Sequence, residues 1–262
     1  MPVEIALSWD TKAYTIFFLV FLRMSGFFYI FPLFSRPYCP TQVRIMLALV
    51  LAALLAPSTG LDPQVMATGV DWSALVVPAI RELTVGVTIG FAALMILVAG
   101  QLAGQYLDLQ MGFFTASQID PVMGGRMPLV GQYLYFVALV TFLGFDGHHV
   151  LLSVMRESLN VIPVGAAFST AGLPHVFHMM SWLFYASLRI SIPVMAALFV
   201  ASVAIGIVGR AMPQLNVFVL GIPLRILVGF TLLVGLVPIY VAFFRETTGE
   251  QVGMLFRMLE VW

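Results

Sequence analysis

Long apolar stretches, separated by short polar or proline- and glycine-containing segments, run along the whole chain. These stretches cover residues 13–34, 43–56, 74–109, 127–145, 149–162, 176–209 and 215–244. Apolar runs of this kind are typical of membrane-embedded helices, which need about 20 residues to cross a bilayer core of about 30 Å. We therefore predict one all-helical, membrane-embedded domain over residues 1–262, with no separate soluble domain.

The lengths of these stretches are uneven. The 43–56 stretch is too short to span a bilayer comfortably, whereas 74–109 would reach about 54 Å as one helix. The 176–209 stretch is similarly long and contains Pro193, which predicts a kink near its middle. Helices of such length must project from the bilayer, break, or belong to an assembly that is not confined to it.

The last segment, 245–262, differs from the rest because it mixes charges with apolar residues. Its apolar positions are Val252, Leu255, Phe256 and Leu259. This spacing predicts a short amphipathic helix at a membrane or protein surface.

The composition agrees with a membrane protein. Hydrophobic residues make up 61% of the chain and charged residues 9%, and the mean hydropathy is +1.04. Soluble domains carry roughly a quarter charged residues. The formal net charge is zero and Lys12 is the only lysine, so no basic surface for nucleic acid is expected. Cys39 is the only cysteine, which excludes a disulfide within the chain. A cleavable signal peptide is not expected, because acidic residues precede the first apolar run and no small-residue cleavage site follows it.

Several charged residues lie inside or against the apolar stretches. They are Arg23, Arg81, Glu82, Asp108, Arg189 and Arg225. A charge facing lipid is costly, so each side chain is expected to face protein, a partner subunit or water. Snorkelling to the membrane interface is the alternative for any one of them. Six together favour a polar interior or contacts between subunits.

Sequence patterns of catalytic or metal sites are missing. His148 and His149 are adjacent, so on a helix they are expected to point about 100° apart. His175 and His178 have a workable spacing, but no nearby acid or cysteine completes a set of metal ligands. The zinc-protease, phosphate-loop and serine-elbow patterns are absent as well. We expect no metal site, no cofactor and no enzymatic activity.

Two pairs of glycines lie in the 74–109 stretch. Gly86 and Gly90 form one G-x-x-x-G pattern, and Gly100 and Gly104 form another. The offset between the two pairs turns a helix by about 1400°, roughly 40° short of four full turns. The four glycines therefore share about one face, where another helix can approach closely. We predict tight helix packing there and assign the four glycines to subunit contacts.

A polar stripe follows at the end of the same stretch. Gln101, Gln105 and Asp108 lie on one helical face. The stripe has two interpretations: a helix end that emerges into water, or the lining of a wet channel or of a seam between subunits.

The segment from Leu109 to Pro121 is too apolar for an ordinary exposed loop and too interrupted for a long helix. Flexible methionines and bulky phenylalanines next to glycines are suited to a deformable apolar stopper. A loop packed into the protein core is the other interpretation of this segment.

Two blocks of sequence resemble the FliR family, the flagellar member of the type III secretion export gate. The first runs from Leu109-Gln110-Met111-Gly112 to Ile119-Asp120-Pro121 and continues in Gly144-Phe145-Asp146-Gly147-His148. The second runs from Gly209 to Pro223 and contains Pro213-Gln214-Leu215-Asn216-Val217-Phe218. Asp146 stands where the family pattern has Asn. Chain length and the order of apolar segments also fit, so the resemblance covers essentially the whole chain.

The resemblance implies a fold and a function that spacing alone does not give. Members form bent helical hairpins in a helical multi-subunit assembly with FliP and FliQ, near FlhB and other export-apparatus proteins. The assembly is the entry channel for unfolded export substrates, in the bacterial inner membrane at the flagellar basal body. It is needed for flagellum assembly.

The resemblance also implies roles for particular residues. The channel plug that keeps the assembly closed corresponds to Met111, Gly112, Phe113, Phe114, Thr115, Ala116, Ser117, Gln118 and Ile119. From residue type alone, without support from the resemblance, we assign Gly112, Gly124 and Gly125 as hinges of this plug. Subunit contacts are expected at Pro213, Gln214, Asn216 and Phe218.

Three other readings remain. A stand-alone secondary transporter would show inverted repeats with matched broken helices, but the sequences around Pro78 and Pro193 do not mirror each other. A membrane enzyme lacks a catalytic constellation. The third is the equivalent subunit of a virulence injectisome, against which Gly221 favours the flagellar branch.

Overall fold

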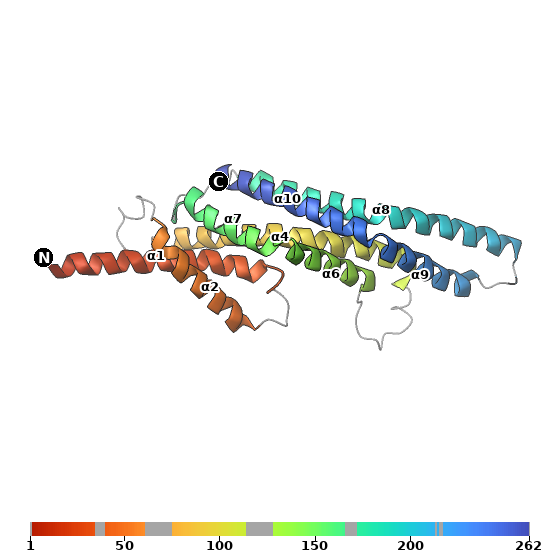
Figure 1. Ribbon diagram of the computed structural model, residues 1–262, viewed down its shortest axis with the longest axis horizontal. Coiled ribbons are helices and arrows are strands. Elements are labelled where there is room, and N and C mark those ends of the chain that lie inside the picture. The colour runs from red at the N-terminus through yellow and green to blue at the C-terminus, as the bar shows by residue number, and fades with distance from the viewer. Residues whose placement is uncertain are drawn as a thin grey trace. The chain divides into compact units, whose positions relative to one another are not determined.

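The computed structural model describes residues 2–34, 40–60, 75–113, 128–165, 172–212, 214 and 217–261. Within them the long elements are helices (Figure 1). The helices are α1 (Pro2–Ile30), α2 (Thr41–Leu55), the short 3-10 helix η1 (Ala56–Ser58), α4 (Val76–Met111), α6 (Leu129–Gly144), α7 (Gly147–Val161), α8 (Leu173–Ala211), α9 (Val217–Gly235) and α10 (Val237–Val261).

The predicted all-helical membrane fold is confirmed. Four helical segments of the described chain are long and apolar enough to cross a membrane, and up to six are if each of two bent pairs counts as one span. The bent pairs are α6 with α7 and α9 with α10. The segment Thr41–Ser58 is among the four, because η1 extends α2 to 18 residues. The 43–56 stretch, which we expected to be too short, is therefore long enough.

The two longest helices are continuous. α4 runs through 36 residues without a break, which corresponds to about 54 Å. α8 runs through 39 residues with Pro193 inside it. At the expected kink, proline removes one backbone hydrogen bond, but the helix continues on both sides.

The end of the chain differs from the prediction. The 215–244 stretch breaks at Leu236, and the charged tail belongs to α10 instead of forming a separate helix. Leu255 and Leu259 are each 1% exposed. The apolar side of this tail therefore packs inside the chain, because it continues the face of a longer helix.

The chain groups into two compact units. Unit 1 comprises Met1–Met95, Gly147–Met179 and Gly249–Trp262, and unit 2 comprises Ile96–Asp146 and Met180–Thr248. Three helices, α4, α8 and α10, run from one unit into the other. The single domain over residues 1–262 stays a prediction, and each unit is described by itself.

In unit 1, glycines allow α1 and α4 to approach closely, while α2 lies beside α1 (Figure 1). A methyl group on Gly86 would overlap the carbonyl oxygen of Arg23, and one on Gly90 would come within 2.8 Å of that of Phe27. On α1, Gly26 in turn faces the backbone of Leu83 on α4. This face of α4 is therefore filled by backbone of the same chain.

In unit 2, the second glycine pair of α4 faces α6. A methyl group on Gly104 would overlap the backbone of Gly131, and one on Gly100 would come within 3.0 Å of the Leu134 carbonyl oxygen. The tight packing expected for both pairs is present within the chain. The assignment of the four glycines to subunit contacts stays a prediction.

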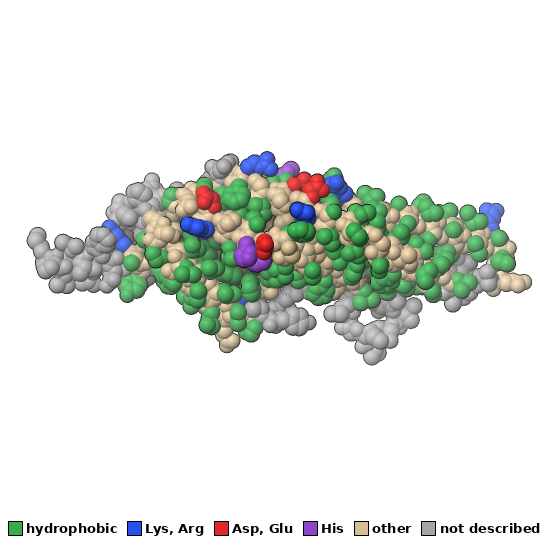
Figure 2. All heavy atoms as spheres, viewed as in Figure 1, with side chains coloured by type: hydrophobic (Ala, Val, Ile, Leu, Met, Phe, Trp, Pro, Cys, Tyr) green, Lys and Arg blue, Asp and Glu red, His purple; other side chains and the backbone are tan. Residues whose placement is uncertain are grey.

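Much of the described surface is apolar (Figure 2). Only 11% of the most apolar segment of α8 is buried within the chain, and the same fraction holds for α2 with η1. The corresponding value for α4 is 67%. Exposed aromatic residues such as Phe184 and Phe199 lie on α8. Faces this apolar need lipid or other membrane helices around them.

Candidate functional site

The segment singled out in the sequence begins where α4 ends. Met111 is the last residue of α4 and is fully buried. Gly112 has φ of +90°, a backbone conformation that residues with a Cβ rarely adopt. Glycine at this position therefore lets the chain turn sharply out of α4.

The first residues of this segment lie against α9. A methyl group on Gly229 would come within 2.5 Å of the Met111 terminal carbon, so the Met111 side chain fills the space that Gly229 leaves open. The rings of Phe113 and Phe230 meet edge to face, with centroids 6.1 Å apart. The chain therefore leaves α4 along an apolar contact with α9.

The described chain resumes at Pro128, and the start of α6 lies beside Asp108, on the last turns of α4. The Asp108 carboxylate accepts hydrogen bonds from the backbone N–H groups of Val130 at 3.0 Å and Gly131 at 3.1 Å. Both N–H groups belong to the first turn of α6. The N–H groups of a first helical turn have no acceptor within their own helix. Pro128 stands at the N-cap position, where its side chain offers no acceptor. Asp108 therefore caps α6 and ties the first turn of this helix to α4.

The predicted polar stripe lies along this junction. Asp108 is only 5% exposed, whereas Gln101 and Gln105 are half-buried. A methyl group on Gly131 would meet the Gln101 carbonyl oxygen at 3.0 Å and the Gln105 Cγ at 3.3 Å. Within the chain, the stripe contacts the start of α6. Its role as a channel lining or a subunit seam stays a prediction.

Several predicted site residues lie outside the described residues. They are Phe114, Thr115, Ala116, Ser117, Gln118, Ile119, Gly124, Gly125, Pro213 and Asn216. Phe218 lies in α9, and its side chain is outside the description as well. Gln214 is exposed, between α8 and α9.

A second buried polar cluster lies in unit 1. Arg23 on α1 and Glu82 on α4 are both fully buried and form an ion pair, with Nε and Oε2 2.5 Å apart. The Arg23 guanidinium also donates to the carbonyl oxygens of Ser158 at 2.7 Å and Ile162 at 3.1 Å. The second carboxylate oxygen of Glu82 accepts from the N–H of Gly165 at 3.0 Å. Buried charges of this kind are stable only when they are paired and hydrogen-bonded.

The remaining charges inside the apolar stretches divide into two groups. Arg81 is buried as well, at 3% exposure. Arg189 is exposed and lies over the ring of Phe243, 5.3 Å from its centroid, and Arg225 is half-buried. The expectation of a polar interior therefore holds for four of the six residues, while the two on α8 and α9 are more accessible.

The turn between α6 and α7 contains Asp146, which belongs to the Gly144–His148 part of the first sequence block. Asp146 has φ of +56°, in the left-handed region that Asn and Asp tolerate better than most residues. An aspartate is therefore suited to this turn. The rings of His148 and His149 lie 4.1 Å apart, and a ligand atom of each lies within 4.8 Å of the other and of an Asp146 carboxylate oxygen. The prediction that the two histidines point apart and therefore cannot chelate together is wrong, because these three residues are close enough to share a metal ion. Rotation about the side-chain bonds brings the rings together although their Cβ atoms diverge.

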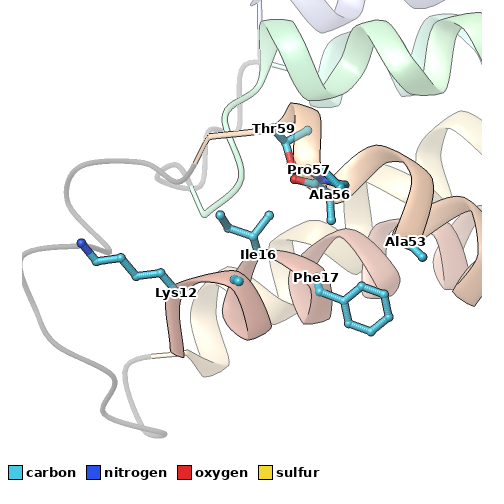
Figure 3. Close-up of a pocket in the computed structure, with 8 residues that line it drawn as sticks. Lys12, Ile16, Phe17, Ala53, Ala56, Pro57 and Thr59 are labelled. Atoms are coloured by element: carbon cyan, nitrogen blue, oxygen red, sulfur yellow. Dashed lines mark hydrogen bonds between the residues drawn. The ribbon is translucent and has the colours of Figure 1, made fainter. Parts of the chain in front are cut away.

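An apolar cavity of about 660 Å³ lies in unit 1 among α1, α2 and η1. In Figure 3, Ile16 points toward Pro57 and Thr59, while the Lys12 side chain extends away from them. The Thr59 hydroxyl donates to the Ala56 carbonyl oxygen. No acidic residue, histidine or cysteine is among the described residues that line this cavity, so its lining lacks a group for acid–base chemistry.

The long-range partners of these residues were missed by sequence reasoning. Neither the capping of α6 by Asp108 nor the pairing of Arg23 with Glu82 follows from local spacing. One signal was available: Pro128 cannot cap the helix that it precedes, so an acceptor had to come from elsewhere. On α9, Gly229 beside an apolar run indicated a close contact, without identifying Met111.

Together these features define a multi-pass helical membrane protein whose polar residues stabilise its own packing. Comparison with known proteins specifies the class further. Residues 14–250 match the family described as bacterial export proteins, family 1. The chain is 38% identical over 222 residues to the flagellar biosynthetic protein FliR of Bacillus subtilis (strain 168), covering 83% of this chain and 84% of that protein.

Further relatives carry the same description. The flagellar biosynthetic protein FliR of Escherichia coli (strain K12) is 28% identical over 242 residues, covering 92% of this chain and 91% of that protein. That of Aquifex aeolicus (strain VF5) is 25% identical over 222 residues, covering 84% of each. The chain belongs to the FliR family of bacterial export proteins, whose members are membrane components of flagellar export and not enzymes.

Proposed function

We propose that this chain is a subunit of the flagellar type III protein export gate and forms, with FliP and FliQ, the entry channel for unfolded export substrates. The observation that carries the proposal is the family match over residues 14–250. The location that follows is the bacterial inner membrane at the flagellar basal body. FlhB and other export-apparatus proteins are further expected neighbours.

The accessible apolar faces support an assembled state. The α8 span and the α2–η1 span are each only 11% buried in the isolated chain, although their hydropathy suits a membrane interior. We assign these faces to contacts with other subunits, together with Pro213, Gln214 and Asn216, between α8 and α9, and Phe218, in α9. Small and amide-bearing residues suit close packing and hydrogen bonding between membrane helices.

We further propose that residues 111–119 form a plug that closes the channel, with Gly112, Gly124 and Gly125 as hinges. Two contacts in unit 2 support this role. Met111 and Phe113 hold the start of the connection against α9, and Asp108 holds its end at the first turn of α6. A connection anchored at both ends can move between its anchors without releasing the helices that carry it.

The proposed mechanism is gating without covalent chemistry. An apolar constriction excludes water and ions while it is closed, and an entering polypeptide displaces it. Phe113 and Phe114 provide the bulk of the obstruction, and methionine and glycine provide its deformability. The energy for transport comes from partner proteins and the proton gradient.

Purification of the tagged chain from its own membrane in mild detergent tests the assembly. The expected result is co-purification with two other small multi-pass proteins, with this chain as the minority component by mass analysis. A monomer or homo-oligomer, under conditions that keep other membrane complexes intact, would contradict the gate and favour a stand-alone transporter.

The plug is tested separately. Deletion within Phe113–Gln118 is expected to raise ion or small-solute leakage through the assembled complex while the subunits still co-purify. Removal of an equal number of residues from the 61–74 connection is the control, and it is expected to leave the membrane tight. Correctly assembled deletion complexes that do not leak would refute the plug.

A further inference from the structure

Three residues whose side chains can bind metal ions lie together at the turn between α6 and α7. They are Asp146, His148 and His149, and one ligand atom of each lies within 4.8 Å of those of the other two. Among the described residues, no other group of three His, Cys, Asp or Glu side chains meets this condition. Asp146 and His149 are exposed and His148 is half-buried, so an ion from solution can reach the group.

The backbone of the turn holds these residues close together. The N–H of Asp146 donates to the Leu143 carbonyl oxygen at 3.2 Å, which closes the last turn of α6. Asp146 then takes φ of +56°, and α7 begins at the next residue, Gly147. Because the three side chains belong to four consecutive residues, their placement depends mainly on this local turn.

The His148 ring supplies a second, independent observation. Its Nδ1 atom is buried and has no hydrogen-bond partner among the described residues. A buried polar atom without a partner is costly. Neutral imidazole is the commonest metal ligand in proteins and can bind through either ring nitrogen. Coordination through Nδ1 would therefore supply the partner that this atom lacks.

We propose that this turn binds a divalent transition-metal ion of the Zn²⁺ type. Two imidazoles and one carboxylate are ligands that zinc accepts, and a site with three protein ligands keeps its fourth position for water. Ligand atoms around tetrahedral zinc are about 3.4 Å apart, so side-chain rotations have to close the gaps by at most about 1.4 Å. Mg²⁺ and Ca²⁺ prefer oxygen ligands, so two imidazoles discriminate against them.

Two positive neighbours keep the expected affinity moderate. The first turn of α7 carries the positive end of a helix dipole. Arg245 lies over the ring of Phe145, 4.8 Å from its centroid. Asp146 and His149 also have other interactions within the chain, which the ion has to replace or share. We therefore expect a dissociation constant of about 1 μM, weaker than that of a structural zinc site.

Zinc titration of the purified protein tests the site. The full chain, with whatever subunits stay bound, carries a tag without histidine, is stripped of metal with EDTA and is titrated with Zn²⁺ against a chromophoric chelator. His148→Gln and His149→Gln should each weaken the binding of one Zn²⁺ per chain by at least about tenfold, because even outer-shell partners of a metal contribute that much. Mg²⁺ at the same concentration should not compete.

Asp146→Asn tests the carboxylate apart from the turn. Asn tolerates the left-handed backbone conformation, so this variant keeps the turn and loses the charge. Its zinc affinity should fall, and an unchanged affinity would overturn the three-ligand site. The matched control is His175→Gln with His178→Gln, which removes the other two histidines of the chain. It should bind zinc like the unmodified chain, and a loss equal to that of His148→Gln would refute the proposal.

Thermal unfolding in detergent gives a second readout. An ion that binds only the folded turn raises stability by mass action, so Zn²⁺ at 100 times its dissociation constant should raise the unfolding midpoint by about 5 °C. The shift should disappear in His148→Gln with His149→Gln. If those variants do not fold, the unmodified chain still decides the question. Absence of zinc binding and of the thermal shift in that chain would refute the site.

Discussion

Two carboxylates near opposite ends of α4 are kept in the protein interior by different means. Glu82, in unit 1, is paired with Arg23 and also accepts from the backbone of Gly165. Asp108, in unit 2, accepts only from two backbone N–H groups at the start of α6 among its described contacts. Glu82 neutralises a buried cation, whereas Asp108 caps the N-terminus of a helix.

The difference determines what each residue is needed for. Removal of Glu82 leaves the fully buried guanidinium of Arg23 without its counter-charge, far from water. Removal of Asp108 leaves two buried N–H groups without an acceptor, but these groups are neutral. The first cluster is therefore expected to be essential for the fold of unit 1. The second is expected to fix one local junction in unit 2.

The largest effect is expected when the ion pair is broken. Glu82→Leu should lower the free energy of unfolding by about 4 kcal/mol, because the Arg23 charge stays buried. Thermal unfolding in detergent, followed by size-exclusion chromatography, measures this loss. The control is Glu157→Gln, an exposed carboxylate of α7, which should change stability by less than about 0.5 kcal/mol.

The double substitution Arg23→Met with Glu82→Leu sharpens this test. It removes both charges and keeps apolar volume, so it should recover more than half of the loss. A double variant as unstable as the single one would show that the hydrogen bonds to Ser158 and Ile162 hold unit 1 together, not the balance of charge.

A smaller loss is expected at the α6 cap. Asp108→Ala should cost about 3 kcal/mol, because two hydrogen bonds to a carboxylate disappear. Asp108→Asn should cost less, because its amide oxygen still accepts one of them. Stability in detergent and hydrogen exchange of the Val130 and Gly131 amides measure the two effects. Unchanged exchange at both amides in Asp108→Ala would contradict the cap.

Close packing of α4 and α6 is tested by adding one methyl group. Gly104→Ala should destabilise by about 2 kcal/mol, because the new carbon meets the rigid backbone of Gly131. Gly206→Ala in α8 is the matched control, since a methyl group there meets nothing within 4 Å. That control should be neutral or stabilise by up to about 1 kcal/mol. Equal effects of the two substitutions would refute the tight contact.

The smallest effect is expected at the contact between Met111 and α9. A methyl group on Gly229 meets only the flexible end of the Met111 side chain. Gly229→Ala should therefore cost less than about 1 kcal/mol, and Met111→Ala in the same background should not add its full cost. A double-mutant cycle on thermal stability measures this coupling. Strict additivity would show that the two residues do not touch.

The sequence predicted the helices well where apolar runs are long. The runs at 74–109 and 176–209 correspond to α4 and α8. Apolar runs of this length are typical of membrane helices and of no other secondary structure. The tail at 245–262 was misjudged because its charges conceal the start of α10 within the preceding apolar run. The break at Leu236 lies between Gly235 and Pro238, a local signal of a helix end that the prediction did not use.

The polar contacts were beyond local reasoning for a different reason. Arg23 and Glu82 were both recognised as charges that need a protein environment. Their pairing depends on how α1 packs on α4. That packing is set by the close backbone approach of the two helices at Gly26 and Gly86. The start and the end of the proposed plug were located by resemblance, whereas the contacts of Asp108 and Phe113 required the structure.

The central claim is that this chain serves flagellar protein export, and removing it from the cell that makes it is the most direct test. The measurement is the amount of flagellar protein outside the cell, with the unmodified chain and Glu157→Gln returned as controls. The account predicts that export stops without the chain, that both controls restore it, and that a Glu82→Leu chain does not. Continued export without the chain would contradict the account.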